Sequence, residues 1–480
     1  MINLENNVAA RVISHFEQLT KIPRCSGQER KVSDYLKQFG EHLGLETIQD
    51  EVLNIIIKKP ASPGYEDHTP VILQGHMDMV CEKDDLCSID FTKDPIKTKV
   101  ENGFIVGDGT TLGADNGIAV AMAMAILEDK DAVHPPIEAL FTVDEERTML
   151  GAREVDLSLL DGKILLNLDT EEEGVAVVGC SGGVRMQLEF PYNREMNSEF
   201  SSGLTIAVTG LTGGHSGMEI HLGRANANVL LTRLLLEIEK ELPFGLISFN
   251  GGAMDNAIPR LAKAEIACHG KDIKRIEELA KEMEELWKFE HGTTDPGLTV
   301  AIKPSPVREF IEDTVRTNLL KAMLIMPNGV QAMNQQLPVV ESSINMGVVI
   351  TEPDKVVIKC SLRSANATLQ DLTENRLRII AELFNANAIK SGAYPAWPYK
   401  PYTKIQEIIK DSYRSLTGKE LKIEVIHAGL ECAMFAQNAP DVELISFGPD
   451  ITGAHAPGEA MNIASVENVW KLLLEVLKNI

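Results

Sequence analysis

The chain has 480 residues, of which 44% are hydrophobic and 24% are charged, so it is long enough for two or three globular domains and its composition does not indicate disorder. Its formal net charge of −24 at pH 7 argues against nucleic acid and anionic membranes as partners, because both require clustered lysine and arginine. The acidic residues are spread along the chain, which is typical of a solubilising surface.

The amino-terminal residues and the cysteines bear on the compartment. Residues 1–7 contain no basic region followed by an apolar stretch, so we expect no secretory signal. The longest apolar run, 117–127, is too short to span a bilayer. The seven cysteines are odd in number and include no Cys-x-x-Cys pair, which favours reduced thiols. We therefore expect a cytoplasmic protein without a membrane partner.

The first 184 residues alternate helices and strands in the rhythm of an α/β domain. The predicted elements are a helix over 6–20, a strand over 47–58 and a buried helix over 117–127. Three further strand-like runs, each followed by polar residues, cover 71–73, 139–143 and 163–168. Because open α/β sheets bind ligands at the carboxyl ends of their strands, these polar residues are candidates for a functional site.

The polar motifs near these strand ends contain the side chains that bind transition metals. They are Gly-His-Met-Asp with His76 and Asp78, Gly-Ala-Asp-Asn-Gly with Asp115, Asp-Glu-Glu with Glu145 and Glu146, and Asn-Leu-Asp with Asp169. A second histidine, His455, stands in Gly-Ala-His-Ala-Pro-Gly-Glu near the other end of the chain. Imidazole together with carboxylate suits zinc, manganese or cobalt better than calcium or magnesium.

The number of candidate ligands favours two metal ions over one. Three carboxylates and two imidazoles are too many for one tetrahedral ion with an open position. If Asp115 bridges two ions, each ion receives one histidine, one terminal carboxylate and a share of the bridge. Two cations about 3.5–4 Å apart polarise a carbonyl and activate water together. Taken singly, Gly-His-x-Asp is typical of a turn and Asp-Glu-Glu-Arg of the start of a helix.

A complete α+β unit separates the first ligands from His455. We expect strands over 204–208, 263–267, 343–351 and 356–364, and helices over 226–242, 272–289 and 368–385. The polar segment 390–400, which contains glycine and prolines, indicates the return to the first domain. The sequence therefore predicts one domain made of 1–184 and 391–480, interrupted by an inserted domain over 185–390. No internal repeat is evident by inspection.

In their types and order, these motifs resemble the co-catalytic zinc aminopeptidase, carboxypeptidase and aminoacylase family, and within it the aminoacyl-histidine dipeptidase branch. The resemblance runs from the amino terminus to the last forty residues. It implies a two-domain α/β metallopeptidase with an inserted α+β lid domain, and two zinc ions that manganese or cobalt can replace. By this resemblance His76 and Asp169 are terminal ligands of one ion, Glu146 and His455 of the other, and Asp115 is the bridge.

The same resemblance implies catalytic roles. Asp78 orients the imidazole of His76, and Glu145 carries the proton of the attacking water to the leaving amine. His215, in Gly-Gly-His-Ser-Gly on the lid, donates a hydrogen bond to the oxyanion in a neighbouring subunit's active site, so we expect a homodimer formed through the lid domain. A surface histidine in a glycine-rich turn is the plainer interpretation. Relatives of this site often have a cis peptide after the bridging aspartate, and we expect one between Asp115 and Asn116.

Three residues are candidates for binding the substrate. Arg363 matches the family position that clamps the substrate carboxylate, although a strand-end salt bridge is an equally ordinary role for an arginine. Asn256 and Glu431 are candidates for contacts with the backbone or the amino group of the substrate. Both are equally typical of turns and helix caps.

The sequence therefore predicts a dinuclear-zinc dipeptidase for unblocked dipeptides, including Xaa-His, where Xaa-His is implied by the family branch only. A deacylase, a desuccinylase or a tripeptidase on the same scaffold is the nearest alternative. A nucleotide-binding protein is a second one, because 107–113 read Gly-x-Gly-x-x-x-Gly, one residue off the dinucleotide fingerprint and without a following Lys-Ser/Thr. A metal-binding protein without activity is the third, and Glu145 disfavours it.

Overall fold

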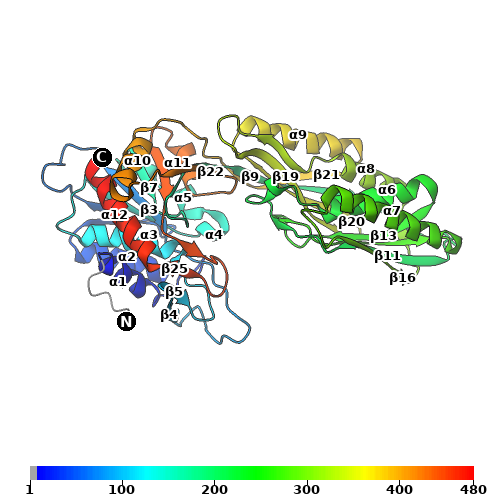
Figure 1. Cartoon of the computed structure of the whole chain (residues 1–480), viewed down its shortest axis with the longest axis horizontal. Helices are drawn as coiled ribbons and strands as arrows, with labels where there is room; N and C mark the ends of the chain where they lie inside the picture. Colours follow the sequence, from blue (N-terminus) through cyan, green and yellow to red (C-terminus); the bar gives the residue numbers. More distant parts are fainter. Residues whose placement is uncertain (1–7) are drawn as a thin grey trace. The chain divides into compact units, whose positions relative to one another are not determined.

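The computed structural model describes residues 8–480 and divides into two compact units. Unit 1 comprises Met1–Cys180, Trp397–Val425 and Leu430–Ile480, and unit 2 comprises Ser181–Ala396 and Ile426–Gly429. In Figure 1, the blue-to-cyan and the orange-to-red parts of the chain together build unit 1, whereas the green and yellow parts build unit 2. Among residues 8–480, no helix combines the length and the apolar character that crossing a membrane requires.

Unit 1 is built around an eight-stranded sheet. Its strands are β1 (Glu46–Gln49), β2 (Ile55–Lys59), β3 (Val71–His76), β6 (Ile137–Thr142), β7 (Ile164–Asn167), β8 (Val175–Cys180), β22 (Lys422–Ile426) and β23 (Glu443–Phe447). They run in the order β1-β2-β6-β3-β7-β23-β8-β22, and β6, β3, β7 and β23 pair in parallel. Every residue of β3, β6 and β7 is buried, as expected for the centre of a covered parallel sheet.

Helices surround this sheet in unit 1. They are α1 (Ala10–Leu19), α2 (Arg30–His42), α3 (Ala114–Glu128), α4 (Glu145–Thr148), α5 (Leu150–Glu154), α10 (Lys404–Thr417), α11 (Cys432–Asn438) and α12 (Ile463–Asn479). The buried helix predicted over 117–127 is confirmed by α3, which packs against β3 and α1. A small sheet of β24 (Ile451–Thr452), β25 (Ala460–Asn462), β5 (Phe104–Gly107) and β4 (Thr98–Glu101) joins the late chain to the segment before α3.

The single strand predicted over 47–58 is wrong, because the structure has the antiparallel pair β1 and β2 there. A tight turn separates them: Asp50 Oδ1 accepts hydrogen bonds from the N–H groups of Val52 and Asn54 at 3.0 and 2.8 Å, and Leu53 has a φ of 81°. Such local side-chain bonding ends a strand without changing its apolar pattern. The helix predicted over 6–20 corresponds to α1, and its residues 6 and 7 lie outside the described residues.

The prediction of reduced cysteines is wrong for one pair. Cys25 and Cys81 form a disulfide with a Cα–Cα distance of 5.7 Å, while Cys87, Cys180, Cys268, Cys360 and Cys432 are free. The two cysteines are 56 residues apart in the sequence, and a β-bridge between Cys25 and Met79 brings them together. Their pairing depends on this tertiary contact, which neither the number nor the spacing of the cysteines reveals.

Unit 2 is an antiparallel sheet covered by helices. Its main strands are β9 (Gly182–Pro191), β11 (Ser202–Thr209), β13 (Phe244–Gly251), β15 (Ala262–Cys268), β16 (Thr299–Ser305), β19 (Val340–Thr351), β20 (Lys355–Ser364) and β21 (Asn387–Tyr394). Short strands add β10 (Arg194–Glu195), β17 (Phe310–Ile311), β18 (Gly329–Met333), and the pair β12 (Gly214–His215) and β14 (Ala257–Ile258). The helices, labelled in Figure 1, are α6 (Ala227–Glu241), α7 (Ile273–His291), α8 (Asp313–Ile325) and α9 (Ala367–Leu383).

The strands and helices predicted between 204 and 385 are confirmed within a few residues by these elements. On β9, for example, Val184, Met186, Leu188 and Phe190 alternate into the core, as the period of a half-buried strand requires. The polar segment 390–400 is only partly a connection, because its first five residues complete the edge strand β21.

The main strands of unit 2 form two copies of one β-α-β-β-α-β order. The first copy runs β11, α6, β13, β15, α7, β16, and it is inserted after β9 into the second copy, β9, α8, β19, β20, α9, β21. Across the sheet the order is β16-β11-β15-β13-β19-β20-β9-β21, so the second strands of the two copies, β13 and β19, meet antiparallel at Gly251 and Val349. The topology thus recurs within unit 2, although inspection of the sequence shows no repeat of residues.

Candidate functional site

Unit 1 gathers the predicted metal ligands at the carboxyl ends of its parallel strands. His76 is the last residue of β3, Glu146 lies in α4 just after β6, and Asp169 follows β7 by two residues. Asp115 lies in the first turn of α3, and His455 lies in the loop between β24 and β25. One ligand atom each from His76, Asp115 and Glu146 lie within 4.8 Å of one another.

Asp115 is the centre of this cluster. Its Oδ1 lies 3.1 Å from Nε2 of His76, and its Oδ2 lies 3.1 Å from Nε2 of His455. Each imidazole also faces a further carboxylate, since His76 Nε2 is 3.5 Å from Asp169 Oδ1 and His455 Nε2 is 2.9 Å from Glu146 Oε2. The side chains thus form two groups of one histidine and one carboxylate, and Asp115 belongs to both.

Close packing holds the start of α3 in place. The peptide bond between Asp115 and Asn116 is cis, which confirms the expectation from the family resemblance. Asn116 Nδ2 donates to the carbonyl oxygen of Leu168 at 2.9 Å, one residue before Asp169. A Cβ atom on Gly75 would lie 2.5 Å from Cβ of Ala119, so only glycine fits at this point of β3.

Asp78 supports His76 and the helix that carries the glutamates. Its Oδ1 lies 3.3 Å from Nδ1 of His76, so Nε2 is the nitrogen that faces the other ligands. The backbone N–H groups of Glu145 and Glu146 donate to its two oxygens at 3.1 and 3.4 Å, and the hydroxyl of Ser26 donates at 2.7 Å. Asp78 is completely buried. Burial opposes its charge, but His76, Ser26 and the N–H of Glu145 lower its pKa.

The cluster concentrates buried negative charge. Burial and the neighbouring carboxylates raise the pKa of Asp169 to about 6 and that of Glu145 well above its usual range. Hydrogen bonds to Asp115 and Glu146 raise the pKa of His455 to about 11. Within residues 8–480, these carboxylates have no lysine or arginine ion pair, and the buried atoms Glu146 Oε1 and Asp169 Oδ1 have no hydrogen bond. Carboxylate oxygens and imidazole nitrogens arranged in this way fit divalent transition-metal ions.

Glu431 lies in a buried polar network of unit 1. It accepts hydrogen bonds from Gln74 Nε2 at 2.6 Å and from Thr142 Oγ1 at 2.7 Å, and Gln74 accepts one from Asn167 Nδ2 at 2.6 Å. Burial raises the pKa of Glu431 to about 7. Its second oxygen, Oε1, has no hydrogen bond within the part of the chain that the structure describes.

His215 and Asn256 lie together in unit 2. His215 in β12 pairs with Ala257 in β14, and the carbonyl oxygen of Asn256 accepts the N–H of Ser216 at 2.8 Å. Nδ1 of His215 accepts the N–H of Met218 at 3.0 Å. Burial and the positive charge of Arg363 lower the pKa of His215. The ring is therefore a neutral imidazole whose proton is on Nε2, where it is available as a hydrogen-bond donor.

Arg363 is a buried cation next to His215. It is 9% exposed, its NH1 donates to the hydroxyl of Tyr394 at 2.9 Å, and its buried Nε has no hydrogen bond. Within residues 8–480, no ion pair joins it to a carboxylate. A Cβ atom on Gly217 would lie 3.1 Å from Nε of Arg363 and 3.0 Å from Cε1 of His215, so the two side chains converge on this glycine. A buried guanidinium in this state favours an anionic ligand.

Sequence reasoning missed a third member of this cluster, His427. Its Nε2 lies 2.7 Å from the hydroxyl oxygen of Ser343, and its carbonyl oxygen would collide with a Cβ atom on Gly217. Burial, Arg363 and His215 lower the pKa of His427 to about 3. The residue stands four positions before Glu431 in the sequence, but nothing in that spacing indicates that it belongs to unit 2.

The glycine-rich loop considered for nucleotide binding is already occupied by a side chain. The N–H groups of Leu112, Gly113 and Ala114, which open α3, all donate to the carboxylate of Glu459 at 2.8, 2.9 and 2.7 Å. A phosphate at the start of a helix needs such free N–H groups. The arrangement therefore disfavours a nucleotide site at 107–113.

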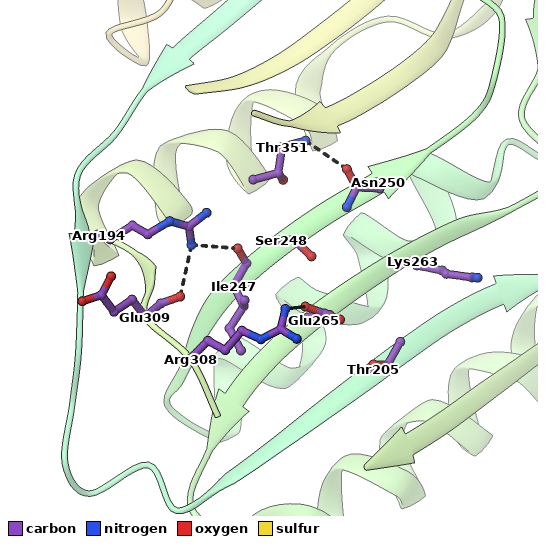
Figure 2. Close-up of a pocket in the computed structure, with 10 residues that line it drawn as sticks. All are labelled: Arg194, Thr205, Ile247, Ser248, Asn250, Lys263, Glu265, Arg308, Glu309 and Thr351. Atoms are coloured by element: carbon purple, nitrogen blue, oxygen red, sulfur yellow. Dashed lines mark hydrogen bonds and ion pairs between the residues drawn. The ribbon is translucent and has the colours of Figure 1, made fainter. Parts of the chain in front are cut away.

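A separate cavity of about 510 Å³ lies on the sheet of unit 2, and Figure 2 shows its lining. Two of its arginines already have partners, since Arg194 donates to the carbonyl oxygens of Ile247 and Glu309 and Arg308 lies 3.6 Å from Glu265. None of the predicted site residues lines this cavity. It is therefore distinct from the two clusters described above.

Comparisons with known proteins agree with this geometry. The sequence pattern described as peptidase family M20/M25/M40 matches residues 72–479. The chain is 37% identical over 467 residues to the cytosol non-specific dipeptidase of Escherichia coli (strain K12), a match that covers 97% of this chain and 96% of that one. It is similar to the crystal structure of an aminoacylhistidine dipeptidase from Vibrio alginolyticus, with a TM-score of 0.91, 36% identity, and coverage of 100% and 98% of the two chains. A tripeptidase from Staphylococcus aureus, with a TM-score of 0.56, 17% identity and coverage of 98% and 97%, shares the fold alone.

Proposed function

Because the chain belongs to peptidase family M20/M25/M40 and is related over nearly all of its length to dipeptidases, we propose that it is a dinuclear-metal dipeptidase that hydrolyses unblocked dipeptides, including Xaa-His. The observation that carries the proposal is the position of Asp115, whose two carboxylate oxygens each lie 3.1 Å from the Nε2 of a different histidine. A carboxylate that bridges two ions needs this arrangement.

We propose that His76 and Asp169 would hold one ion, Glu146 and His455 the other, and Asp115 both. The short His76–Asp169 and His455–Glu146 distances support this division. We propose zinc as the resident metal, with manganese or cobalt as substitutes. When bound, the ions supply Lewis acidity that polarises the scissile carbonyl and lowers the pKa of water.

Within unit 1, Glu145 is the proton carrier of the proposed reaction. It takes the proton of the attacking water and delivers it to the leaving amine, so that one carboxylate serves both transfers. Asp78 supports this step, because it holds Nδ1 of His76 and the backbone N–H groups of Glu145 and Glu146 at the same time. The proton carrier and two ligands thus depend on one buried carboxylate.

Within unit 2, Arg363 and His215 recognise the peptide. Arg363, a buried cation without a carboxylate partner in residues 8–480, pairs with the substrate carboxylate, and the Nε2–H of His215 donates to the oxyanion of the tetrahedral intermediate. Because both side chains converge on Gly217, we propose that they act on the same peptide molecule. Asn256 and Glu431 remain candidates for contacts with the backbone or the amino group of the peptide. Asn256 lies beside the loop of His215, and Glu431 has one oxygen without a hydrogen bond within residues 8–480.

Unit 2 also carries a surface that supports a homodimer. On α9, Leu372, Ile379 and Leu383 are 45%, 54% and 67% exposed, and their spacing of seven and four residues places them on one stripe. We propose that a second copy of the chain covers this stripe, so that Ile379→Glu shifts the molar mass measured by light scattering from dimer to monomer. We also propose a cytoplasmic location, because the Escherichia coli relative is named a cytosol enzyme.

The proposed function is tested with the purified full-length chain. After dialysis against EDTA and reloading with zinc, manganese or cobalt, it is assayed against Xaa-His dipeptides, other dipeptides, tripeptides and N-acyl amino acids. We expect dipeptide hydrolysis that EDTA removes and metal restores. Preference for N-acyl amino acids or for tripeptides would instead favour the alternative activities on this scaffold.

Metal content gives an independent measurement of the ligand assignment. Elemental analysis is expected to find two metal ions per chain in the wild type and fewer in His76→Ala and His455→Ala, because each ion loses its only nitrogen ligand. Full stoichiometry in both variants would contradict the assignment.

A further inference from the structure

The carboxylate of Glu459 joins two loops from distant parts of the chain. The four consecutive N–H groups of residues 112–115 donate to it, two to each oxygen, at 2.8, 2.9, 2.7 and 3.2 Å. Glu459 is 2% exposed, so water does not compete for these bonds. The last of the four donors belongs to Asp115 itself, and Glu459 follows His455 by four residues. One buried carboxylate therefore connects the proposed bridging ligand to the loop of a terminal ligand.

The loop that carries His455 has few other restraints. It contains Gly453, Pro457 and Gly458. Within residues 8–480, two backbone hydrogen bonds join it to the segment before α3, from the N–H of Gly458 to the carbonyl oxygen of Thr110 and from the N–H of Gly107 to the carbonyl oxygen of Glu459, both at 3.0 Å. The side chain of His455 is 52% exposed, and its backbone has a φ of 62°. Packing against a core thus does not fix this histidine, so its position depends on where the end of the loop is held.

The turn that Glu459 binds is itself fixed by a buried charge. Arg24, 2% exposed, donates through NH1 to the carbonyl oxygens of Met77 and Asp78 at 3.0 and 2.9 Å, and through NH2 to that of Gly113. A Cβ atom on Gly113 would collide with this guanidinium. Arg24 thus ties the turn to the residues that follow His76. The segment 112–115 is a rigid support, and Glu459 is the connection through which the loop of His455 attaches to it.

We propose that Glu459 is a positioning residue of the metal centre: it sets the separation of His455 from Asp115 and thereby the affinity of the ion that His455 and Glu146 hold. The inference rests on the dinuclear assignment made under the proposed function. Among residues 8–480, the carboxylate of Glu459 bonds only to backbone N–H groups, so we expect its effect to reach catalysis through His455.

The test is Glu459→Gln in the full-length chain. An amide in place of the carboxylate presents N–H groups to two of the four donors, which leaves them unbonded. Cobalt(II) is titrated into the metal-free protein and followed by calorimetry and visible absorption. The wild type is expected to bind two ions, whereas the variant keeps the affinity of one site and loses about 10- to 100-fold at the other. The control is Glu467→Gln, which removes only a Glu467–Lys471 pair of 2.7 Å on α12 and is expected to bind both ions normally.

A double-mutant cycle identifies the affected site. If Glu459 acts through His455, then His455→Ala combined with Glu459→Gln weakens cobalt binding no more than His455→Ala alone. Additive losses would overturn the proposal, because Glu459 would then act independently of His455. Wild-type affinity at both sites in Glu459→Gln would overturn it as well.

Folding is monitored separately by circular dichroism of the metal-free proteins. If Glu459→Gln does not fold, Glu459→Asp takes its place in the titration. This variant keeps the charge on a shorter side chain, so the expected loss of cobalt affinity is smaller. Failure of both variants to fold would overturn the proposal in favour of a general role in the fold. No substrate is present in these titrations, so two bound ions without peptidase activity would refute the proposed function alone. Fewer than two ions in the wild type would refute the dinuclear assignment and this inference together.

Discussion

The two units assemble opposite kinds of chemistry. In unit 1, carboxylates in α3, in α4 and just after β7 gather around two histidines, and within residues 8–480 no lysine or arginine forms an ion pair with them. In unit 2, Arg363 lies with the neutral imidazoles of His215 and His427, and no carboxylate pairs with it in the same range. The carboxylates of one cluster suit a cation, and the guanidinium of the other suits an anion.

This difference indicates which partner each cluster requires. Burying unpaired charge is costly, so a ligand or metal that pairs with these charges stabilises such a cluster. We propose metal ions as the partners of the cluster in unit 1, and a carboxylate such as that of a dipeptide as the partner of the cluster in unit 2. Substitutions in unit 1 are therefore expected to impair proton transfer and metal binding. Substitutions in unit 2 are expected to impair recognition of the peptide.

The largest effect is expected from Glu145→Gln, which removes chemistry from unit 1 and leaves the ligand set intact. Loss of the proton carrier lowers kcat by about 10²- to 10⁴-fold, while elemental analysis still finds two ions per chain. Glu154→Gln on α5, an exposed position, is the control and keeps full turnover. Near-normal kcat in Glu145→Gln would remove this residue from its role.

The next effect is expected from His215→Ala in unit 2. Loss of one donor to the oxyanion lowers kcat by about 10²- to 10³-fold with unchanged metal content. His221→Ala, an exposed histidine six residues away, is the control.

Mixing variants shows which subunit His215 serves. If it acts on a neighbouring subunit, His215→Ala and Glu145→Gln proteins regain activity after subunit exchange, which mass spectrometry verifies. Mixing His215→Ala with Arg363→Ala is expected to restore no activity, whether His215 serves its own subunit or its neighbour. Both residues belong to one cluster around Gly217, so each site in the mixture still lacks one of them. Recovery in this second mixture would contradict the proposal that the two residues act on the same peptide.

A smaller effect is expected from Arg363→Ala. Without the guanidinium, kcat/KM for a dipeptide falls by about 10- to 100-fold, because a charge-assisted bond to the substrate carboxylate is lost. The same dipeptide with an amidated carboxyl end is expected to lose little, since it lacks that charge. Equal losses for both substrates would show that Arg363 does not bind the carboxylate. The control for a general effect of charge is Arg378→Ala, an exposed arginine on α9 that lies outside the stripe of Leu372, Ile379 and Leu383.

The smallest effect concerns stability at acid pH. The pKa of His427 is lowered from 6.5 to about 3 by burial, Arg363 and His215, with His221 adding to the same direction. Between these values the unfolded chain binds a proton that the folded chain does not, so the free energy of unfolding falls as the pH falls. From pH 7 to pH 5 this costs about 2 kcal/mol. The free energy of unfolding is measured with guanidinium at pH 7 and pH 5 for the wild type and for His427→Gln. Between these pH values it is expected to fall further in the wild type than in the variant, by this amount. An equal fall in both proteins would contradict the prediction.

Much of the architecture could be predicted because local patterns encode it. The apolar runs of β3, β6 and β7 and the stripes of α6, α7 and α9 satisfy the periods of buried strands and amphipathic helices, and these periods depend only on backbone geometry. The candidate ligands could be named for a related reason, since polar residues at the ends of parallel strands meet at one edge of a sheet.

What the pattern alone could not provide are contacts between residues that are distant in sequence. The pairing of Cys25 with Cys81, the place of His427 beside Arg363, and the bonds from Glu459 to the turn before α3 each join segments that no sequence period relates. The repeated strand order of unit 2 could not be predicted from the sequence either, because topology can recur without a repeat of residues.

The sequence by itself thus determined which side chains can bind metal, carry a proton and hold a carboxylate, because these capacities are properties of single residues and short motifs. The tertiary structure decided which of them meet. It placed the two oxygens of Asp115 against two histidines that lie 379 residues apart in the chain, His76 and His455, and it placed Arg363 beside His215. Distances of this kind follow from the packing of whole sheets and helices, which depends on all of their contacts at once.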